Sequence, residues 1–325
     1  MRYLGPDLSL DGALRDLGSS SLAARLEAIE ALGQQSTHAG QISPVLRPLL
    51  DDDDPDVRYA AALALGRLTD TESVTRLIGI LAGDPEPMPR QAAAVALGDI
   101  GDLRALEPLT RALHDSLAEV RLQAVSALPL LDSPAVADPL RQALQDEDQE
   151  VRATAAAGLG DIRDDASRDR LVRVTRDDPD PRVQFEAAMA LARMGDRRGT
   201  PLLTSMIDHR DFGLLAVEHL FRCPDEAARK PLHDTLSRWL SSPLSKVWAA
   251  AALVRLGDTD ARAFLQEQLH SRKEMVRGLT IQVLGKLDQP WSRKELKSLL
   301  EKPANGDWSR WRPDILQALG EGEVD

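Results

Sequence analysis

The sequence has 325 residues, of which 43% are hydrophobic and only 3% aromatic, and its formal net charge is −12. This apolar content excludes a wholly disordered chain, and a composition dominated by alanine and leucine favours closely packed helices over a β-sheet. The single cysteine, Cys223, excludes a disulfide framework within the chain.

We expect a cytoplasmic protein without a membrane span. The first residues carry charges throughout and lack the uninterrupted apolar run of a signal peptide. Nowhere in the sequence do about 18 apolar residues follow one another, the minimum for a transmembrane helix.

From its amino-terminal end, the chain predicts a short helix over 10–17 and then an apolar pattern that recurs about every 31 or 32 residues. Clear copies include VRYAAALALGRL from Val57 and VRATAAAGLGDI from Val151, whereas FGLLAVEHLFRC from Phe212 is degenerate. A second apolar segment, such as ALEPLTRAL, lies between successive copies. A fixed period of this length indicates stacked helix pairs. The copies begin at Ala24, Val57, Pro89, Val120, Val151, Val183, Phe212, Ser245, Val276 and Trp311.

Acidic turns are predicted between the two helices of each pair. Asp54 is well placed as an N-cap, with Pro55 at the first helical position, and Asp178-Pro179 is expected to repeat the arrangement. Each repeat is therefore predicted to be a helix, a short acidic turn, a second helix and a short loop.

This organisation resembles the HEAT repeat, and in particular its short variety named after phycobilisome lyase subunits. The resemblance covers residues from about 20 to 320 and rests on first-helix prolines, turn aspartates and Val-Arg pairs. It implies an all-α, right-handed α-solenoid of about ten helix pairs. Solenoids of this kind serve many unrelated roles, so the likeness by itself does not give the function. The residues that carry it are Pro48, Pro108, Pro139, Pro201 and Pro231 and the pairs at 57–58, 120–121, 151–152 and 276–277.

Helical periodicity predicts which face of the recurring helix is buried. An advance of about 100° per residue places Val57, Ala61, Ala64, Leu65 and Leu68 on one stripe, which we expect to be buried. The arginine after the first residue lies at the edge of this stripe. We expect these arginines to pair with turn aspartates of adjacent repeats in a ladder; they are Arg58, Arg90, Arg121 and Arg152.

The opposite face of the same helices carries apolar residues where water would favour polar ones. In HEAT-like folds this helix lines the concave face, so we expect a shallow groove that binds a helical or basic segment of a protein partner. Acidic turns at its rim would attract a basic partner. The alternative is that packing between repeats covers these side chains. The groove residues are Tyr59, Leu63, Val95, Leu122, Phe185 and Met189.

Charge divides the predicted solenoid. Residues 1–225 contain 24 arginines and no lysine against 38 acidic residues, and the lysines and tryptophans all follow. We therefore expect a capping helix (1–19), acidic repeats (20–222) and basic, tryptophan-containing repeats with a carboxy-terminal cap (223–325), and a hinge near residue 212. The basic part predicts a patch for an anionic partner, formed by Lys246, Trp248, Arg255, Lys273, Arg277 and Lys286.

A second interpretation of the basic part is structural. The remaining tryptophans would then fill gaps in a degenerate end cap, and the lysines would be ordinary solvated charges. These tryptophans are Trp239, Trp291, Trp308 and Trp311.

No catalytic or metal-binding motif is recognisable in the sequence. Its six histidines are scattered, none within a paired His-Glu or His-x-x-His pattern, and its glycines suit helix ends rather than a phosphate-binding loop. We expect a non-catalytic interaction scaffold or adaptor without metal or cofactor. Two alternatives stay open, namely a bilin-lyase-like chromophore chaperone and nucleic-acid binding through the basic carboxy-terminal third. The acidic first 225 residues would repel a nucleic-acid duplex.

Overall fold

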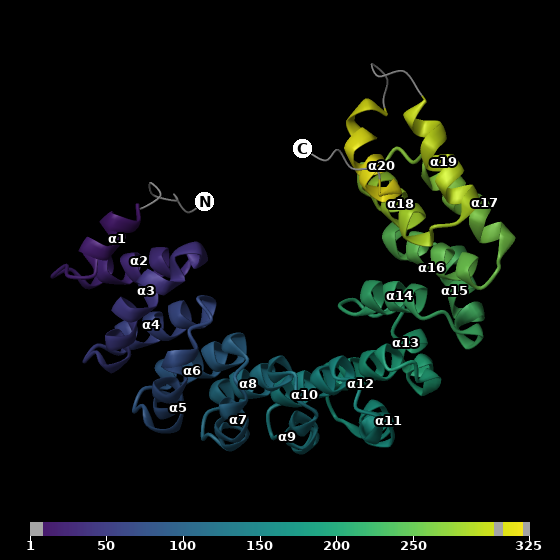
Figure 1. The fold of residues 1–325 in the computed structure, drawn as a ribbon. Helices are drawn as coiled ribbons and strands as arrows, with labels where there is room; N and C mark the ends of the chain where they lie inside the picture. The colour runs from purple at the N-terminus through teal and green to yellow at the C-terminus, as the bar shows by residue number, and fades with distance from the viewer. Residues whose placement is uncertain (1–8, 302–307, 321–325) are drawn as a thin grey trace. The chain divides into compact units, whose positions relative to one another are not determined.

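The computed structural model of the protein describes residues 9–301 and 308–320 (Figure 1). These residues fold into α-helices joined by turns and short 3₁₀ segments, and no β-strand occurs among them. The helices are α1 (Leu10–Asp16), α2 (Leu22–Gly33), α3 (Ala39–Leu46), α4 (Pro55–Arg67), α5 (Val74–Gly83), α6 (Pro87–Ile100), α7 (Leu106–Ala112), α8 (Ala118–Ala127), α9 (Ala137–Ala143), α10 (Gln149–Asp161), α11 (Arg168–Asp177), α12 (Pro181–Arg193), α13 (Thr200–Ser205), α14 (Gly213–Arg222), α15 (Arg229–Ser237), α16 (Pro243–Arg255), α17 (Thr259–Gln268), α18 (Glu274–Leu287), α19 (Pro290–Leu300) and α20 (Arg312–Leu319).

The helices form consecutive pairs from α1–α2 to α19–α20, and the second helix of each pair carries the recurring pattern. The prediction of an all-α, right-handed α-solenoid of about ten helix pairs is confirmed. None of the helices in the described part of the chain is long and apolar enough to cross a lipid bilayer.

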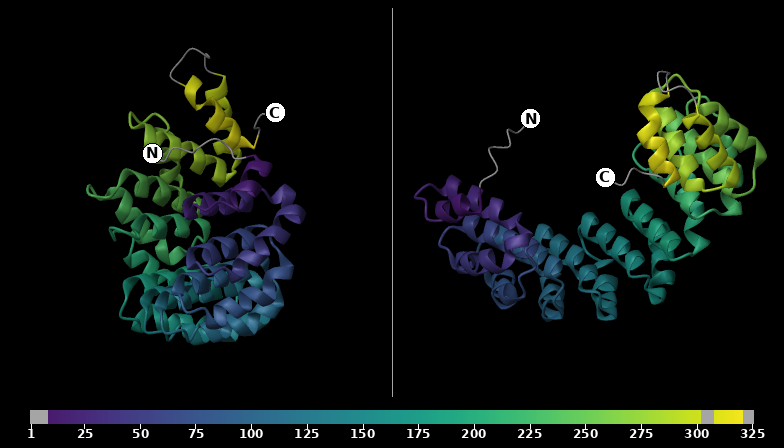
Figure 2. Two further views of the ribbon diagram at one scale, coloured as in Figure 1. Left: turned by 90° about the vertical axis from the view of Figure 1, so that its left-hand side faces the viewer. Right: turned by 45° about the horizontal axis from the view of Figure 1, so that its top comes forward.

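Two compact units make up the chain. Unit 1 contains the residues up to Leu171 together with Asp178–Ala190, and unit 2 contains Val172–Asp177 and the residues from Leu191 onward. Within unit 1, α4, α6, α8 and α10 lie side by side in one row, and α5, α7 and α9 lie in a second row (Figure 1). The further views show the helices of unit 1 following one another in chain order (Figure 2). We call the first row, with the part of α12 up to Ala190, the inner row. The predicted division into 1–19, 20–222 and 223–325 stays a prediction.

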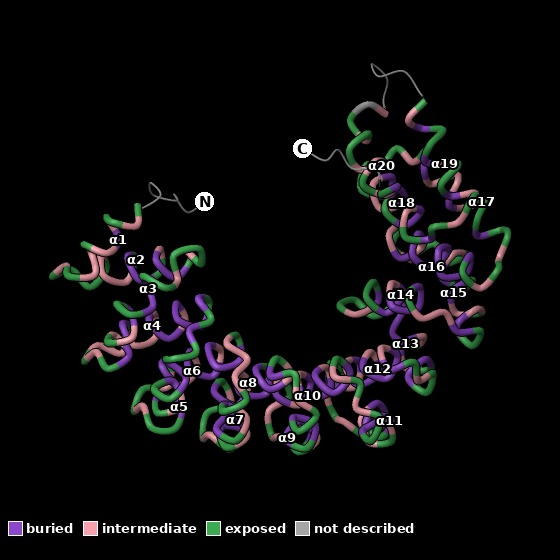
Figure 3. Tube along the Cα trace, viewed as in Figure 1, coloured by how far each residue is buried: buried purple, intermediate pink, exposed green. Residues whose placement is uncertain are grey.

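The predicted stripe of the recurring helix forms the core. In α4 and at its C-cap, the side chains of Val57, Ala61, Ala64, Leu65 and Leu68 are all buried. Along unit 1, buried residues gather where neighbouring helices face each other (Figure 3). Since one helix pair cannot cover both of its apolar faces, each pair is stabilised by the next.

Glycine and alanine allow the helices of the inner row to approach closely. A Cβ atom added to Gly66 would lie 2.7 Å from the Cα atom of Ala96 on the next helix, which is closer than such atoms can come. The same relation joins Gly33 to Ala64, so the contact recurs from one repeat to the next. Larger residues at these positions would push the stacked helices apart.

Aspartate N-caps begin several of the recurring helices. The prediction for Asp54 is confirmed, because its side chain accepts a hydrogen bond from the Asp56 amide at 2.9 Å and Pro55 opens α4. The prediction for Asp178-Pro179 is wrong. In α12, it is Asp180 that accepts from the Arg182 amide at 2.8 Å, and the helix begins at Pro181.

Candidate protein-interaction surfaces

Four arginines join successive acidic turns of unit 1 in a ladder. Each guanidinium donates two parallel hydrogen bonds to one aspartate of the next turn; both measure 2.9 Å between Arg121 and Asp146. Bidentate, charge-assisted bonds of this kind are among the strongest that side chains form. The predicted ladder is therefore confirmed. Its rungs are Arg58–Asp84, Arg90–Asp115, Arg121–Asp146 and Arg152–Asp178, and Arg25–Asp52 adds an ion pair at the amino-terminal end.

Every rung is also tied to the backbone of the turns that it joins. Arg121 Nη1 donates to the carbonyl oxygen of Asp115 at 3.1 Å, and the Asp148 amide donates to Asp146 Oδ1 at 2.8 Å. Because the Asp115 side chain accepts from Arg90, Asp115 links two consecutive rungs. The ladder holds the turns in register, so these side chains are structural.

The ladder changes the acidity of its carboxyl groups. Burial raises the pKa of the Asp84 carboxyl, but hydrogen bonds from the Arg58 side chain and the Glu86 amide outweigh burial and bring the pKa below its usual range. The pKa of the Asp115 carboxyl is also lowered, because hydrogen bonds from the Arg90 side chain and the Leu117 amide outweigh the effect of burial. Both groups are therefore ionised at neutral pH.

Apolar side chains lie on the inner row of unit 1, as the predicted groove requires. Tyr59, Leu63, Val95, Leu122 and Met189 are each half-buried, so part of every side chain faces solvent. They come from α4, α6, α8 and α12. Four of the five helices of the inner row, all but α10, therefore add these apolar groups to one surface, which we call the inner surface.

Phe185 does not belong to the inner surface. The helical period places it on the same face of α12 as Met189, but its side chain is buried, with 1% of its area exposed. A partner could not contact it without rearrangement of the unit, and we leave it out of the surface.

Acidic residues border the inner surface. Asp56 and Glu119 are exposed at the amino-terminal ends of α4 and α8, and Asp99 and Asp161 are exposed near or at the carboxy-terminal ends of α6 and α10. Arg67, at the end of α4, is an exposed cation on the same border. An apolar strip with carboxylates at both edges is suited to an apolar segment that carries positive charges.

The proposed anionic-partner patch of unit 2 is partly buried. Lys246 is half-buried, and Arg255, Lys273 and Lys286 are exposed, but Trp248 and Arg277 are buried. Of the predicted patch, cations are therefore accessible to a partner, whereas its tryptophan is not.

Internal aromatic contacts account for this burial. The ring of Trp248 lies 5.2 Å from that of Phe221, and the Lys286 ammonium lies 5.0 Å above the Trp248 ring. Arg277 lies 5.1 Å above the Trp308 ring. These cations stabilise aromatic side chains within the unit, and the Trp248 ring is not free to stack on a nucleic-acid base.

His219 lies in α14, and Cys223, four residues later, is the C-cap of the same helix. Both residues line a recess of about 200 Å³. Burial is the main cause that lowers the pKa of His219 to about 4, and Arg193 and Arg222 add to it. The imidazole is therefore neutral at pH 7. The half-buried Cys223 thiol donates to the carbonyl oxygen of Ala192 at 3.5 Å.

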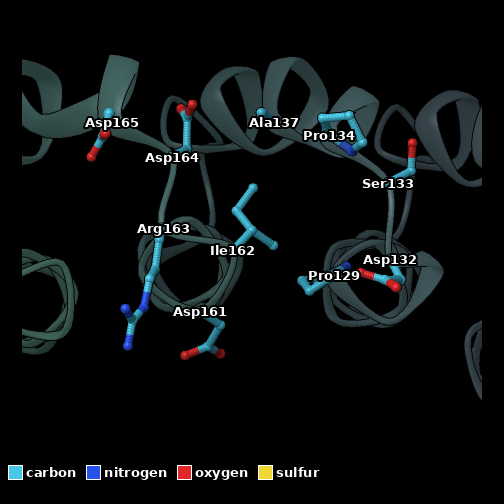
Figure 4. A pocket seen from close by; sticks show the side chains of 10 residues that line it. All are labelled: Pro129, Asp132, Ser133, Pro134, Ala137, Asp161, Ile162, Arg163, Asp164 and Asp165. Carbon is cyan, nitrogen blue, oxygen red and sulfur yellow. The ribbon is translucent and has the colours of Figure 1, made fainter.

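A larger recess of about 560 Å³ opens in unit 1 between the turns that follow α8 and α10 (Figure 4). The carboxylates of Asp132, Asp161, Asp164 and Asp165 point in different directions around it. Arg141 donates to Asp164 at 2.6 Å and neutralises it. Within residues 9–301 and 308–320, no three His, Cys, Asp or Glu side chains are placed to hold one metal ion.

Three overlapping stretches of the chain, residues 12–97, 74–147 and 137–221, match the family model for HEAT repeats. The chain belongs to the HEAT-repeat family. No curated protein matches its sequence.

Two solved structures resemble the chain. A chain of the structure of Kap95p with RanGDP is 13% identical over 95% of this chain and 51% of its own length, with a TM-score of 0.56. A chain of the CpcE–CpcF complex of phycocyanin lyase from Nostoc sp. PCC7120 is 21% identical over 72% of this chain and 96% of its own length, with a TM-score of 0.49. The first likeness shows the α-solenoid fold.

One HEAT repeat of unit 2 exposes apolar residues that the sequence did not predict as a surface. In the turn between α15 and α16, Trp239 is 90% exposed and Leu240 is 81% exposed. The interpretation of Trp239 as a gap-filling residue of an end cap is therefore wrong. The sequence did contain a signal of this exposure. Each ladder aspartate of unit 1 stands five residues before the first residue of its pattern copy, and the residue five positions before Ser245 is the apolar Leu240.

Proposed function

We propose that this HEAT-repeat protein is a non-catalytic scaffold or adaptor, and that unit 1 binds a helical segment of a protein partner along its inner surface. The single observation that supports the proposal is the set of half-buried apolar side chains on α4, α6, α8 and α12 of the inner row. Proteins seldom gather such apolar groups on one exposed face unless the face binds something.

Helix geometry indicates what the partner looks like. Packed helices lie about 8–10 Å apart, and seven residues of an α-helix rise by about 10.5 Å. A helix laid across the inner row would therefore bring an apolar side chain to each successive repeat if its apolar residues recur about every seven positions. The acidic border of the inner surface favours lysine or arginine between them.

A designed peptide tests this directly. The probe is a fluorescein-labelled helical peptide with leucine at every seventh position and lysines between, compared with the same peptide carrying glutamates in place of the lysines. We expect the lysine peptide to bind the full chain in fluorescence anisotropy and the glutamate peptide to bind at least tenfold more weakly, because the border is acidic.

Two variants locate the binding. Leu63→Glu with Leu122→Glu places charges on the inner surface at α4 and α8 and should weaken binding of the lysine peptide at least tenfold. Leu103→Glu is the matched control, because Leu103 is an exposed leucine of unit 1, 58% exposed, that precedes α7 and lies off the inner row. Unchanged binding by the double variant, with native helicity in circular dichroism, would contradict the proposal.

A further inference from the structure

The turn between α15 and α16 presents an apolar tip on a cationic segment. Trp239 and Leu240 are the most exposed large apolar residues in the described part of the chain. The surrounding segment, residues 238–246, contains Arg238 and Lys246 and no acidic residue. Arg238 forms an ion pair with Asp208, which anchors the base of the turn to the turn before α14. We call Trp239 and Leu240 the Trp-Leu tip.

The Trp-Leu tip occupies a turn position that carries the ladder in unit 1. There, the residue equivalent to Leu240 is an aspartate that closes a rung. The ladder does not reach this turn, because the position of the preceding repeat that would supply the arginine is Gly213. Leu240 is 81% exposed, so packing within unit 2 does not account for an apolar residue here.

Further apolar and cationic groups adjoin the tip. Leu214 and Leu215 are exposed in the first turn of α14, directly after the turn that Asp208 joins to Arg238. Arg210, in that same turn, is also exposed. Tryptophan and arginine are the residue types most enriched among those that dominate binding energy at protein interfaces. The surface is thus an apolar patch with Arg210, Arg238 and Lys246 at its border, although the turn before α14 also exposes Asp211 and Asp208, the partner of Arg238.

The chain itself carries the complement of this patch. The inner surface of unit 1 is apolar and has an acidic border, whereas the Trp-Leu tip is apolar and its own segment, residues 238–246, carries cations and no acidic residue. We infer that the Trp-Leu tip of one copy docks on the inner surface of a second copy, so that the protein self-associates. This inference rests on the proposed function, because it assigns an occupant to the same inner surface.

Charge distribution favours a second copy as the occupant. Residues 1–225 carry an excess of acidic residues, whereas all lysines lie at or beyond Lys230. Two copies therefore attract each other when the basic part of one meets the acidic part of the other. If each of two copies places its tip on the inner surface of the other, the contact closes a dimer. If each copy instead binds a different neighbour, the contacts continue into a longer chain of copies.

Sedimentation velocity of the full chain tests the inference. Over about 1–100 µM protein, the range of moderate interface affinities, we expect the mean mass to rise with concentration and the association to weaken at high salt. Trp239→Ser with Leu240→Asp, which gives position 240 the aspartate of the unit 1 turns, should weaken association at least tenfold. Leu103→Ser, which removes an exposed leucine elsewhere, should leave it unchanged.

Mixing two defective variants gives the decisive result. The Leu63→Glu and Leu122→Glu variant lacks the inner surface but keeps the tip, whereas the Trp239→Ser and Leu240→Asp variant lacks the tip but keeps the surface. Neither should self-associate alone, and the equimolar mixture should form a heterodimer through the one intact contact. Circular dichroism must show native helicity for both variants, so that a mixture that does not associate reports on the contact and not on misfolding.

The outcomes separate this inference from the proposed function. A wild type that is monomeric at every concentration, a mixture that does not associate, or a tip that binds anionic phospholipid vesicles in the absence of self-association would overturn the inference. In each of these cases the lysine peptide can still bind the inner surface, and the proposed function then stands. Loss of peptide binding, with self-association intact and insensitive to Leu63→Glu and Leu122→Glu, would overturn both.

Discussion

Removal of one rung of the ladder tests how unit 1 is stabilised. The change is Arg121→Met, which keeps the aliphatic part of the side chain and removes the guanidinium. Arg121 and Asp146 form the least exposed rung, with 7% and 10% of their side-chain area exposed. The substitution removes two hydrogen bonds to Asp146 and one to the Asp115 carbonyl.

The expected loss in the free energy of unfolding is about 3 kcal/mol, because removing one member of a buried ion pair costs about 3–5 kcal/mol. We take the lower end because Asp146 keeps its hydrogen bond from the Asp148 amide and has some access to water. Arg104→Met is the matched control. Its ion pair with Asp102 lies within one turn, and the arginine side chain is 54% exposed, so the expected loss is much smaller than for Arg121→Met.

Hydrogen exchange is the appropriate assay, since repeat arrays depart from two-state unfolding and a single melting curve would average over the units. Amide protection should fall in α8 and α10, the helices that the rung joins, and less in α2. Equal losses for Arg121→Met and Arg104→Met, or a loss below about 1 kcal/mol for the former, would refute the account of the ladder as a main stabilising element.

Two further predictions concern a buried histidine and a close helix contact. Burial lowers the pKa of His219 to about 4 from an ordinary value of 6.5, so the stability of unit 2 is highest above pH 6.5 and falls by up to about 3 kcal/mol as the pH drops toward 4. The His219→Gln variant should lack this pH dependence in chemical denaturation. An identical slope of unfolding free energy against pH in wild type and variant would contradict the assignment. Gly66→Ala should destabilise unit 1 by more than about 1 kcal/mol, because its new methyl group meets Ala96. Gly79→Ala, in a helix with open space around that position, should stabilise unit 1 by about 0.5–1 kcal/mol. If urea unfolding gave stability changes of the same sign for both variants, the steric argument would be wrong.

The fold could be predicted because the same physical constraints recur in every repeat. Val57 and Leu65 are buried where the helical period places them, and Arg58 reaches Asp84 in the next turn as the ladder requires. A single copy of the pattern would have been ambiguous. Its repetition at a nearly constant spacing identifies the stacked helix pair as the unit.

Side-chain exposure could not be predicted to the same extent. A helical period assigns Phe185 to the inner face of α12, but it does not show how neighbouring helices cover that face, and the side chain is buried. Trp248 is buried for a related reason, since Phe221 and Lys286 both lie against its ring. The N-cap of α12 was misplaced because Asp178 serves the ladder, whereas Asp180 caps the helix.

The ladder also bears on how the chain folds during its synthesis. The two residues of each rung are only 25 or 26 positions apart in the sequence. Proteins whose contacts join nearby residues fold fast, since little loop entropy is lost before a contact forms. As the ribosome delivers the chain, each new repeat of unit 1 can dock on its predecessor once its acidic turn has emerged. The growing end is then the only repeat with an uncovered apolar face, so that little of the nascent chain is open to aggregation at any moment.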